Sequence, residues 1–363
     1  MIYLDNASTT MVDGQVMDVY QDIQREAYYN SESLHIGGVH TRQLLDGCKQ
    51  FIKDYFSTVK EVIYTRSGSH ANEIAIHSFL KEKEGGKVLV SPYEHPSIHA
   101  ALEVYQDDFD IIMLPLDNNG EIDLEQTTDL MTDDVVLIIA QHVNSETGYI
   151  LPVEELSQIA LDYNIPMHVD GVQAVHKLKD INVKWFSSYA FSGHKFHGTK
   201  GSGVLMINHE YVKPLNQHYF HEMYTQNGTI DSPSIIAMTK ALSITPSIDE
   251  MHTLQQYFIE QLSDLSFTPI VYKAQAPHII AVLTPIYEGQ YIMQYLSNRN
   301  ICVSTGTACG HGALLSSGLQ VKIDSIPEKT YDQYIRLSIG KFTTRNDIDT
   351  CLHHLKTAIR GDQ

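Results

Sequence analysis

The stretch VVLIIAQHVNSETGYILPVEELSQIALDYNIPMHVD, residues 135–170, holds two short apolar runs on either side of a longer amphipathic segment. The first run, VVLIIAQ, and the last, IPMHVD, have the length and composition of buried strands. The intervening LPVEELSQIALDY carries its apolar residues at helical spacing. A strand, a helix and a second strand in this order are typical of an α/β fold with a parallel sheet.

The same alternation extends from about residue 60 to about residue 245. Strand-like EVIYT, KVLVS, DIIMLP, SSYAFS and GVLMIN share this region with helical HANEIAIHSFLKEK and HPSIHAALEVY. We therefore predict a mostly parallel sheet with helices on both faces. Beyond Ser243 to Ser247 the regularity ends, and helices such as LQQYFIEQLSDL mix with short strands such as IIAVL. This change predicts a second, smaller α+β domain.

Charge and composition exclude several classes of function. The 363 residues include 25 Lys and Arg against 44 Asp and Glu, a formal net charge of -19. Such a charge repels nucleic-acid backbones and anionic membranes, so no direct nucleic-acid partner is expected. No apolar run approaches the ~18 residues that span a bilayer, and the start, MIYLDNASTT, lacks the basic region of a signal peptide. We expect a cytoplasmic protein without a membrane partner.

The four cysteines are too few for a disulfide framework, and none forms a CxxC pair for zinc. Cys48 and Cys351 lie in helical apolar stripes, and Cys302 lies between Ile301 and Val303, so all three are predicted to be buried. Cys309 differs, because its neighbours in STGTACGHGALLSSG are small and cannot bury it. It is therefore the candidate for a reactive thiol.

Polar residues follow the predicted strands at the points where they end. His95 follows KVLVSPY, Asp170 and Gln173 follow IPMHV, and Lys195 follows the strand that ends at Phe191. In an open α/β sheet, ligands bind at the carboxyl ends of the strands, so we expect these side chains to meet. Each alone has an ordinary interpretation as a surface lysine, a capping carboxylate or a structural histidine. The glycines of GTKGSG are not a dinucleotide fingerprint, because a strand follows them where a helix should begin.

Together these residues fit pyridoxal phosphate (PLP). This cofactor needs a lysine for its Schiff base, a carboxylate for its pyridine nitrogen and a cradle for its phosphate. Lys195, Asp170 and the SGSHAN turn, residues 67–72, supply one of each. His95 has the shape to pack on the ring and a pKa suited to acid–base work, and Gln173 can bond the phenolic oxygen.

The sequence resembles the cysteine desulfurases of the nitrogen-fixation and iron–sulfur-cluster group, within the class V aminotransferase family. IYLDNASTT resembles the family's usual IYLDxAATT, and SLH, EHP, HVNSETG, HVDGVQ, SGHK, TACG and IRLSIGKFTT follow in the family's order over essentially the whole chain. The resemblance implies the PLP-dependent transferase fold of type I. It implies a large PLP-binding domain over residues 14–245, with residues 1–13 and 246–363 forming the small α+β domain.

The resemblance also implies a role for each matched residue. Lys195 forms the Schiff base, Asp170 pairs with the ring nitrogen, and His95 stacks on the ring. Cys309 is the nucleophile that takes the sulfur as a persulfide. The remaining cofactor residues are Gly68, Ser69, Gln173, Ser192, His194 and, from the partner subunit of a homodimer, Thr229. The residues for the substrate are Arg336, which grips its carboxylate, and Asn144.

The implied reaction is the PLP-dependent conversion of L-cysteine to L-alanine, with transfer of the sulfur from Cys309 to a protein acceptor. The acceptor can serve iron–sulfur cluster assembly or tRNA thiolation, and the sequence does not choose between them. Two alternatives stay open. A class V aminotransferase or selenocysteine lyase would need Cys309 less, or not at all. A degenerate homologue would bind PLP weakly and serve as an interaction scaffold.

Three positions depart from the family pattern. The phosphate turn TSGGTEAN is TRSGSHAN here, with Arg66 and His70 as new residues, and Ser145 replaces the second Asn of HVNNE. HYFHEMYTQNGT, residues 218–229, replaces a glycine triplet and arginines. His218 and His221 beside Glu222 have metal-like spacing, but further zinc ligands are not evident, so no metal site is predicted.

Overall fold

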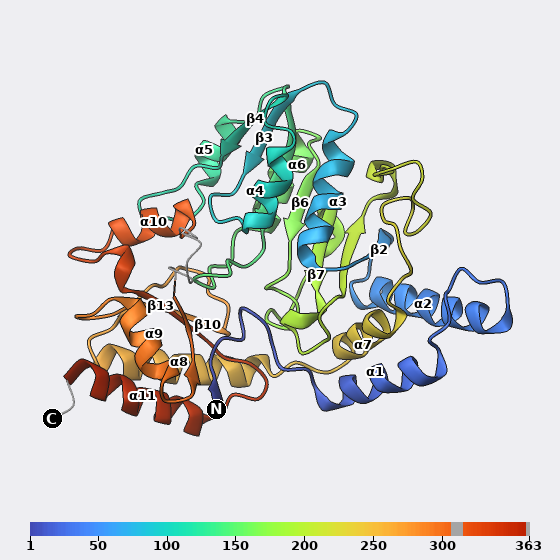
Figure 1. Ribbon diagram of the computed structural model, residues 1–363. Coiled ribbons are helices and arrows are strands. Elements are labelled where there is room, and N and C mark those ends of the chain that lie inside the picture. Colours follow the sequence, from blue (N-terminus) through green and yellow to red (C-terminus); the bar gives the residue numbers. More distant parts are fainter. Residues whose placement is uncertain (306–314, 361–363) are drawn as a thin grey trace.

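The computed structural model describes residues 1–305 and 315–360, without the side chain of Arg360. Its centre is a seven-stranded sheet in the order β2-β8-β7-β6-β5-β3-β4 (Figure 1). The strands are β2 (Glu61–Thr65), β3 (Gly86–Val90), β4 (Phe109–Met113), β5 (Val135–Gln141), β6 (Met167–Asp170), β7 (Ser188–Ser192) and β8 (Gly203–Ile207). β4, β3, β5, β6 and β7 run parallel, while β8 is antiparallel to both β7 and β2. The predicted mostly parallel sheet is confirmed.

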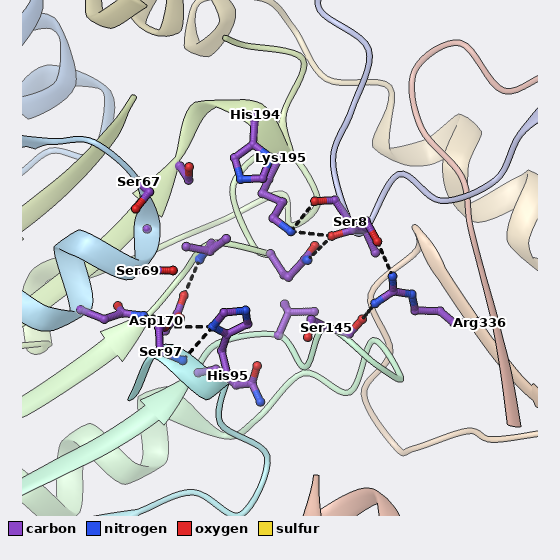
Figure 2. A pocket seen from close by; sticks show the side chains of 18 residues that line it. Ser8, Ser67, Ser69, His95, Ser97, Ser145, Asp170, His194, Lys195 and Arg336 are labelled. Atoms are coloured by element: carbon purple, nitrogen blue, oxygen red, sulfur yellow. Dashed lines mark hydrogen bonds between the residues drawn. The ribbon is translucent and has the colours of Figure 1, made fainter. Parts of the chain in front are cut away.

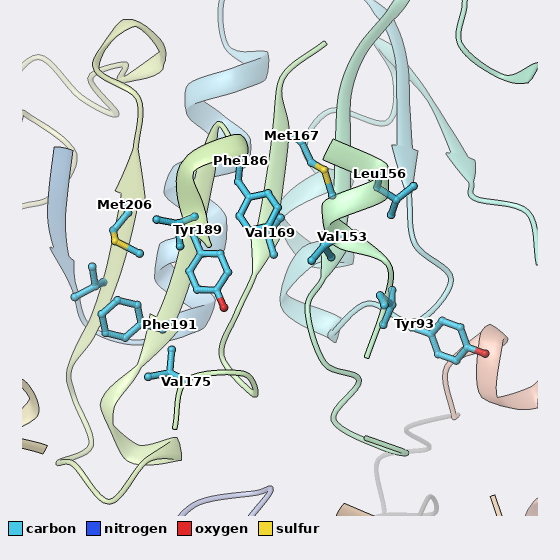
Figure 3. Close-up of a cluster of buried hydrophobic side chains, with 14 of the residues drawn as sticks. Tyr93, Val153, Leu156, Met167, Val169, Val175, Phe186, Tyr189, Phe191 and Met206 are labelled. Atoms are coloured by element: carbon cyan, nitrogen blue, oxygen red, sulfur yellow. The ribbon is translucent and has the colours of Figure 1, made fainter. Parts of the chain in front are cut away.

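Helices cover both faces of this sheet, as the strand–helix alternation predicts. They are α1 (Gly14–Glu26), α2 (Ile36–Tyr55), α3 (Gly68–Leu80), α4 (Pro96–Glu103), α5 (Leu124–Asp129), α6 (Val153–Asp162) and α7 (Ser232–Leu242). Neighbouring residues of β5 point to opposite faces. Ile138 joins the core that includes α2, α6 and α7, whereas Ile139 joins the core under α3 and α4. Figure 3 shows part of the first core, with Met167, Val169 and Tyr189 from the sheet against Val153 and Leu156 of α6.

The C-terminal part has its own sheet and core. Strands β12 (Ser304–Thr305), β13 (Tyr334–Ser338), β10 (Ile279–Leu283) and β9 (Thr268–Pro269) pair antiparallel in that order. The helices are α8 (Ile248–Asp264), α9 (Gly289–Ser297), α10 (Ser317–Asp324) and α11 (Arg345–Arg360). Apolar residues of α8, α9, α11, β10 and β13 share one core.

The N-terminal strand lies with this C-terminal part. β1 (Ile2–Tyr3) pairs in parallel with β11 (Ile301–Cys302). From there the chain passes between the two sheets before α1 begins at Gly14 (Figure 1). The predicted domain boundary at residue 245 falls between the end of α7 at Leu242 and the start of α8 at Ile248. The division into residues 14–245 and the two flanking segments stays a prediction.

One edge of the central sheet is closed by side chains from residues 218–229. On the edge strand β2, the backbone N–H of Tyr64 donates to Glu222 Oε2 at 2.7 Å, and its carbonyl accepts from the Gln226 amide. Lys49 Nζ lies 2.9 Å from the same Glu222 oxygen. Glu222, Met223 and Tyr224 all have positive φ, between 48° and 66°. These contacts satisfy groups that an open edge would offer to another strand.

Two expectations about cysteines can be compared with the structure. Cys48 and Cys351 are buried, as predicted. Cys302 is only partly buried, so that prediction was wrong, because β11 is two residues long and the cysteine lies at its end. Cys309 lies outside the described residues.

Within residues 1–305 and 315–360, no helix has both the length and the hydropathy needed to cross a membrane.

Candidate active site

A cavity of about 420 Å³ opens at the carboxyl ends of β5, β6 and β7 (Figure 2). The N-terminal segment and β13 complete its wall. It brings together nine of the residues that the sequence predicted for a site: Gly68, Ser69, His95, Asp170, Gln173, Ser192, His194, Lys195 and Arg336. The carboxyl ends of neighbouring parallel strands therefore converge as expected.

Lys195 ends a short 3₁₀ turn, Gly193–Lys195, that follows β7. Its Nζ donates to the carbonyl oxygens of Ala7 at 2.7 Å and Ser8 at 2.8 Å. The pKa of Lys195 is lowered to about 8, mainly by burial and also by Arg336, against the opposing effect of Asp170 and Asp5. An amine with this pKa is partly uncharged near neutral pH, the form that attacks a carbonyl carbon.

Asp170 is the last residue of β6 and is 6% exposed. Its Oδ1 accepts the N–H of Val172 at 2.9 Å, and its Oδ2 accepts from the Asn72 amide nitrogen at 2.8 Å. The Asn72 oxygen lies 3.1 Å from His168 Nε2 in turn. Two donors hold a buried carboxylate in one orientation at the cavity wall. Such a group favours a cationic partner in the cavity.

A phosphate-sized cradle lies where β2 leads into α3. Ser67 caps the helix by accepting the N–H of His70 at 3.1 Å, so the first N–H groups of α3 lack partners within the helix. Helix N-termini of this kind bind anions. A Cβ on Gly68 would stand 2.5 Å from Val172 Cγ2, so only glycine leaves this space open. His194 lies beside the cradle, and burial, with Lys195 and Lys200, lowers its pKa to about 4.

The two new residues of this turn do not block the cradle. His70 is buried, and its Nδ1 accepts the backbone N–H of Arg66 at 3.3 Å. Burial, together with the charge of Arg66, lowers the pKa of His70 to about 4, so the ring is neutral. The hydroxyl of Ser69 remains on the cavity wall.

Arg336 lies on β13, and its guanidinium contacts both the turn at Ser145 and the N-terminal segment (Figure 2). Its Nη1 donates to the Ser145 carbonyl at 2.7 Å, and its Nη2 donates to Asp5 Oδ1 at 2.9 Å and to Ser8 Oγ at 2.7 Å. Its Nε is buried and has no hydrogen-bond partner among the residues that the structure describes. Because Ser145 contributes its backbone carbonyl, the change from Asn to Ser preserves this contact.

Gln173 connects the site to the C-terminal sheet. Its amide nitrogen donates to the Ala7 carbonyl at 2.7 Å, and its oxygen lies 3.1 Å from Nε2 of His278, which is completely buried. His278, Asn72, Ser97 and Ser8 were not predicted from the sequence as site residues. Asn72 and Ser97 carried a weak signal, since they stand inside SGSHAN and just after EHP, but nothing near His278 in the sequence points to the site.

Two predicted residues do not line the cavity. Asn144 is buried, and its Oδ1 accepts from the N–H groups of Glu146 and Thr147 and from the Thr147 hydroxyl. These bonds use the amide oxygen and hold the turn that presents Ser145. The amide nitrogen donates to the Tyr93 carbonyl at 3.2 Å, so only its second hydrogen is left for a substrate contact. Thr229 is exposed, outside the cavity of its own chain.

The comparisons with known proteins agree with this geometry. The model of the aminotransferase class-V family matches residues 2–351. The chain is 32% identical to the putative cysteine desulfurase NifS of Bacillus subtilis, over 97% of this chain and 93% of the relative. It is 30% identical to the cysteine desulfurase IscS of Dictyoglomus turgidum, over 99% and 94%. A solved NifS-like protein superposes with a TM-score of 0.90 at 24% identity, over 99% of each chain, which supports the fold.

The chain therefore belongs to the class V aminotransferase family, and within that family it is a homologue of the NifS and IscS cysteine desulfurases. The predicted fold of type I and the predicted enzyme class are confirmed. The family is PLP-dependent.

Among the described residues, no group of three or more His, Cys, Asp and Glu side chains could hold a metal ion. In the HxxH region, Glu222 pairs with Lys49 instead.

Proposed function

We propose that this protein binds PLP at Lys195 and desulfurates L-cysteine in the cavity between its two sheets. One observation carries the proposal. An amine with a lowered pKa, a buried carboxylate and an arginine from three separate segments face one cavity (Figure 2). An amino acid bound to PLP requires these three groups.

The residues of the cavity fit PLP. The cradle at Gly68, Ser69, Ser192 and His194 would hold the phosphate, since it joins a helix N-terminus to space that a Cβ would fill. Asp170 would pair with the ring nitrogen, and Gln173 would donate to the phenolic oxygen. When bound, PLP supplies an electron-withdrawing ring that weakens the bonds to the α-carbon of an amino acid.

Several residues of this chain then have defined tasks. Arg336 binds the substrate carboxylate, because its planar guanidinium stays charged and its Nε has no partner within residues 1–305 and 315–360. Lys195 accepts and returns a proton at Nζ, for which a pKa of about 8 is suited. His95 lies over the cavity and provides a second proton-carrying group. Asn144 supports this subsite from behind Ser145.

Cys309 is the proposed sulfur acceptor within the enzyme. Its thiolate attacks the sulfur of the substrate, so that an S–S bond forms while the C–S bond breaks. The electron pair of that bond goes to the former cysteine carbon, which takes a proton and becomes the methyl group of alanine. Ser304 of β12 pairs with Arg336 of β13. In the sequence, Cys309 follows Ser304 by five residues. Five residues of fully extended chain span at most ~18 Å, and this length limits the distance between the thiol and Arg336.

We also propose a symmetric homodimer in which the exposed Thr229 of each subunit completes the phosphate site of its partner. The persulfide would pass to a protein acceptor, and the expected compartment is the cytoplasm. An equilibrium measurement of molar mass with mixed subunits tests the dimer. A catalytically dead Lys195→Ala subunit paired with a Thr229→Ala subunit should differ in PLP affinity from the parent dimers.

The decisive experiment measures alanine and sulfide release from L-cysteine, with L-serine and selenocysteine as parallel substrates. Cys309→Ser should keep PLP binding and lose alanine production and any persulfide that an alkylating probe can trap. Cys302→Ser is the control, because that thiol is partly exposed and lies outside the proposed chemistry, and it should keep full turnover. If Cys309→Ser made alanine at the unchanged rate, the aminotransferase or lyase alternative would replace the desulfurase. A protein that bound PLP only weakly and released neither alanine nor sulfide would leave the scaffold alternative.

A further inference from the structure

A continuous line of hydrogen bonds joins two groups on opposite sides of the cavity, Asp170 and His95. Asn72 donates to Asp170 Oδ2 at 2.8 Å and to the Ser97 hydroxyl oxygen at 3.1 Å. That hydroxyl lies 2.9 Å from His95 Nδ1 (Figure 2). The backbone N–H of Ser97 also donates to His95 Nδ1, at 3.1 Å.

The chemistry of the groups fixes the direction of each bond. An ionised carboxylate only accepts, so the Asn72 nitrogen must face Asp170, and its second hydrogen reaches Ser97. The Asn72 oxygen then accepts from His168 Nε2, 3.1 Å away. Complete burial lowers the pKa of His168 to about 3, so this ring is neutral, and its Nδ1 lies 2.7 Å from the Ser188 hydroxyl.

Two donors therefore converge on one nitrogen of His95. Since the Ser97 oxygen accepts from Asn72, the serine is free to direct its own hydrogen to His95 Nδ1. The backbone N–H of Ser97 already points to the same lone pair. A nitrogen that accepts two hydrogen bonds cannot carry a hydrogen, so the neutral ring holds its proton at Nε2.

We propose that Ser97 is a positioning residue that holds the proton of His95 at Nε2 and keeps the ring neutral at pH 7. The proposal rests on the proposed function and adds to it. It gives His95 the role of a proton donor at Nε2 in the resting enzyme. Among the described residues, three titratable groups act on the charge of His95: Asp170 from β6, Lys195 from the turn after β7, and His99 from α4, the helix that His95 caps. Desolvation in the cavity lowers the pKa of His95; Asp170 opposes this, and Lys195 and His99 lower it further.

The tautomer and the titration of His95 test the proposal. Full-length protein with ¹³C and ¹⁵N in its histidine rings is measured with PLP and again after removal of PLP, and His95→Gln assigns the resonances. The neutral wild-type ring should show the Nε2–H form. Ser97→Ala removes one donor to the unprotonated nitrogen, so the His95 pKa should rise by about half to one unit. Ser97→Thr keeps the hydroxyl and should restore the wild-type pKa.

Two further readouts separate positioning from general damage. His99 lies on the same helix and serves as an internal control, since its titration should move much less in Ser97→Ala. In the active enzyme, the pH profile of kcat should shift in the same direction as the His95 pKa in Ser97→Ala and return to its wild-type position in Ser97→Thr. An Nδ1–H form in the wild type, or an unchanged His95 pKa in Ser97→Ala, would overturn the proposal. Because the spectra need no turnover, that outcome is independent of whether the protein desulfurates cysteine.

Discussion

Replacing Gly68 by alanine adds a single methyl group to the proposed phosphate cradle. The new Cβ would lie 2.5 Å from Val172 Cγ2 and 3.5 Å from Ser192 Cβ. Carbon atoms in favourable contact stand ~3.5–4.0 Å apart, so the two methyl groups must separate by roughly 1 Å. Val172 lines the cavity, and we expect its side chain to move into the space meant for the cofactor.

The size of this displacement determines how much the free energy of PLP binding is weakened. Overpacking by one methyl group typically costs ~1–3 kcal/mol, which corresponds to a roughly 5- to 150-fold increase in the Kd for PLP. Titration of PLP-free protein with PLP, followed by absorbance, measures that Kd. Thermal unfolding of the PLP-free protein should change less than the affinity, because the cavity can take up the displaced side chain when PLP is absent.

Gly47→Ala is the matched control. Gly47 also lies in a helix, α2, but a Cβ there would have nothing within 4 Å. The substitution should raise the free energy of unfolding by about 0.5–1 kcal/mol and leave PLP affinity unchanged. The cradle assignment would be refuted if Gly68→Ala bound PLP as tightly as the wild type, or if both alanine variants lost affinity equally.

Two other predictions concern the lysine and the buried histidine. Lys195 is protonated below its pKa of about 8, and only the uncharged amine captures PLP. The rate of PLP capture should therefore rise about tenfold between pH 6.5 and 7.5 and level off above pH 8.5. With an ordinary lysine, the rate would continue to rise beyond pH 10. Since Arg336 helps to lower this pKa, stopped-flow capture by Arg336→Gln should show its midpoint at higher pH. His278→Phe removes the donor to Gln173, so the affinity for PLP, measured by titration of PLP-free protein, should fall about fivefold. His278→Gln keeps a donor and should recover most of this affinity. Equal affinity in the wild type and both variants would contradict the role of this contact.

The sequence predicted the features that depend on local pattern. The unit β5–α6–β6 is apparent from apolar spacing, and Asp170 and Lys195 follow their strands directly, so their meeting at one edge of the sheet follows from parallel topology. The SGSHAN turn was found for the same reason, because it links a strand to the start of a helix, and the family resemblance singled out Gly68 within it.

The features that the sequence did not predict depend on distant segments. The contact between Arg336 and Asp5 joins residues 331 positions apart, and that between His278 and Gln173 joins residues 105 apart. No local spacing indicates such pairs. Cys302 was wrongly predicted to be buried because apolar neighbours in sequence do not determine where a two-residue strand ends.

The contact of Glu222 with the edge strand makes one amide a reporter of a whole segment. The Tyr64 N–H has a side-chain carboxylate as its acceptor instead of a neighbouring strand. Its hydrogen therefore exchanges slowly with solvent only while residues 222–226 remain docked, and exchange at this position follows the opening of that segment alone. The same segment leads to Thr229, which is proposed to contact the partner subunit. Comparing the exchange rate of the Tyr64 N–H in isolated subunits and in dimers would therefore show whether subunit pairing strengthens or weakens the docking of residues 222–226 on their own chain.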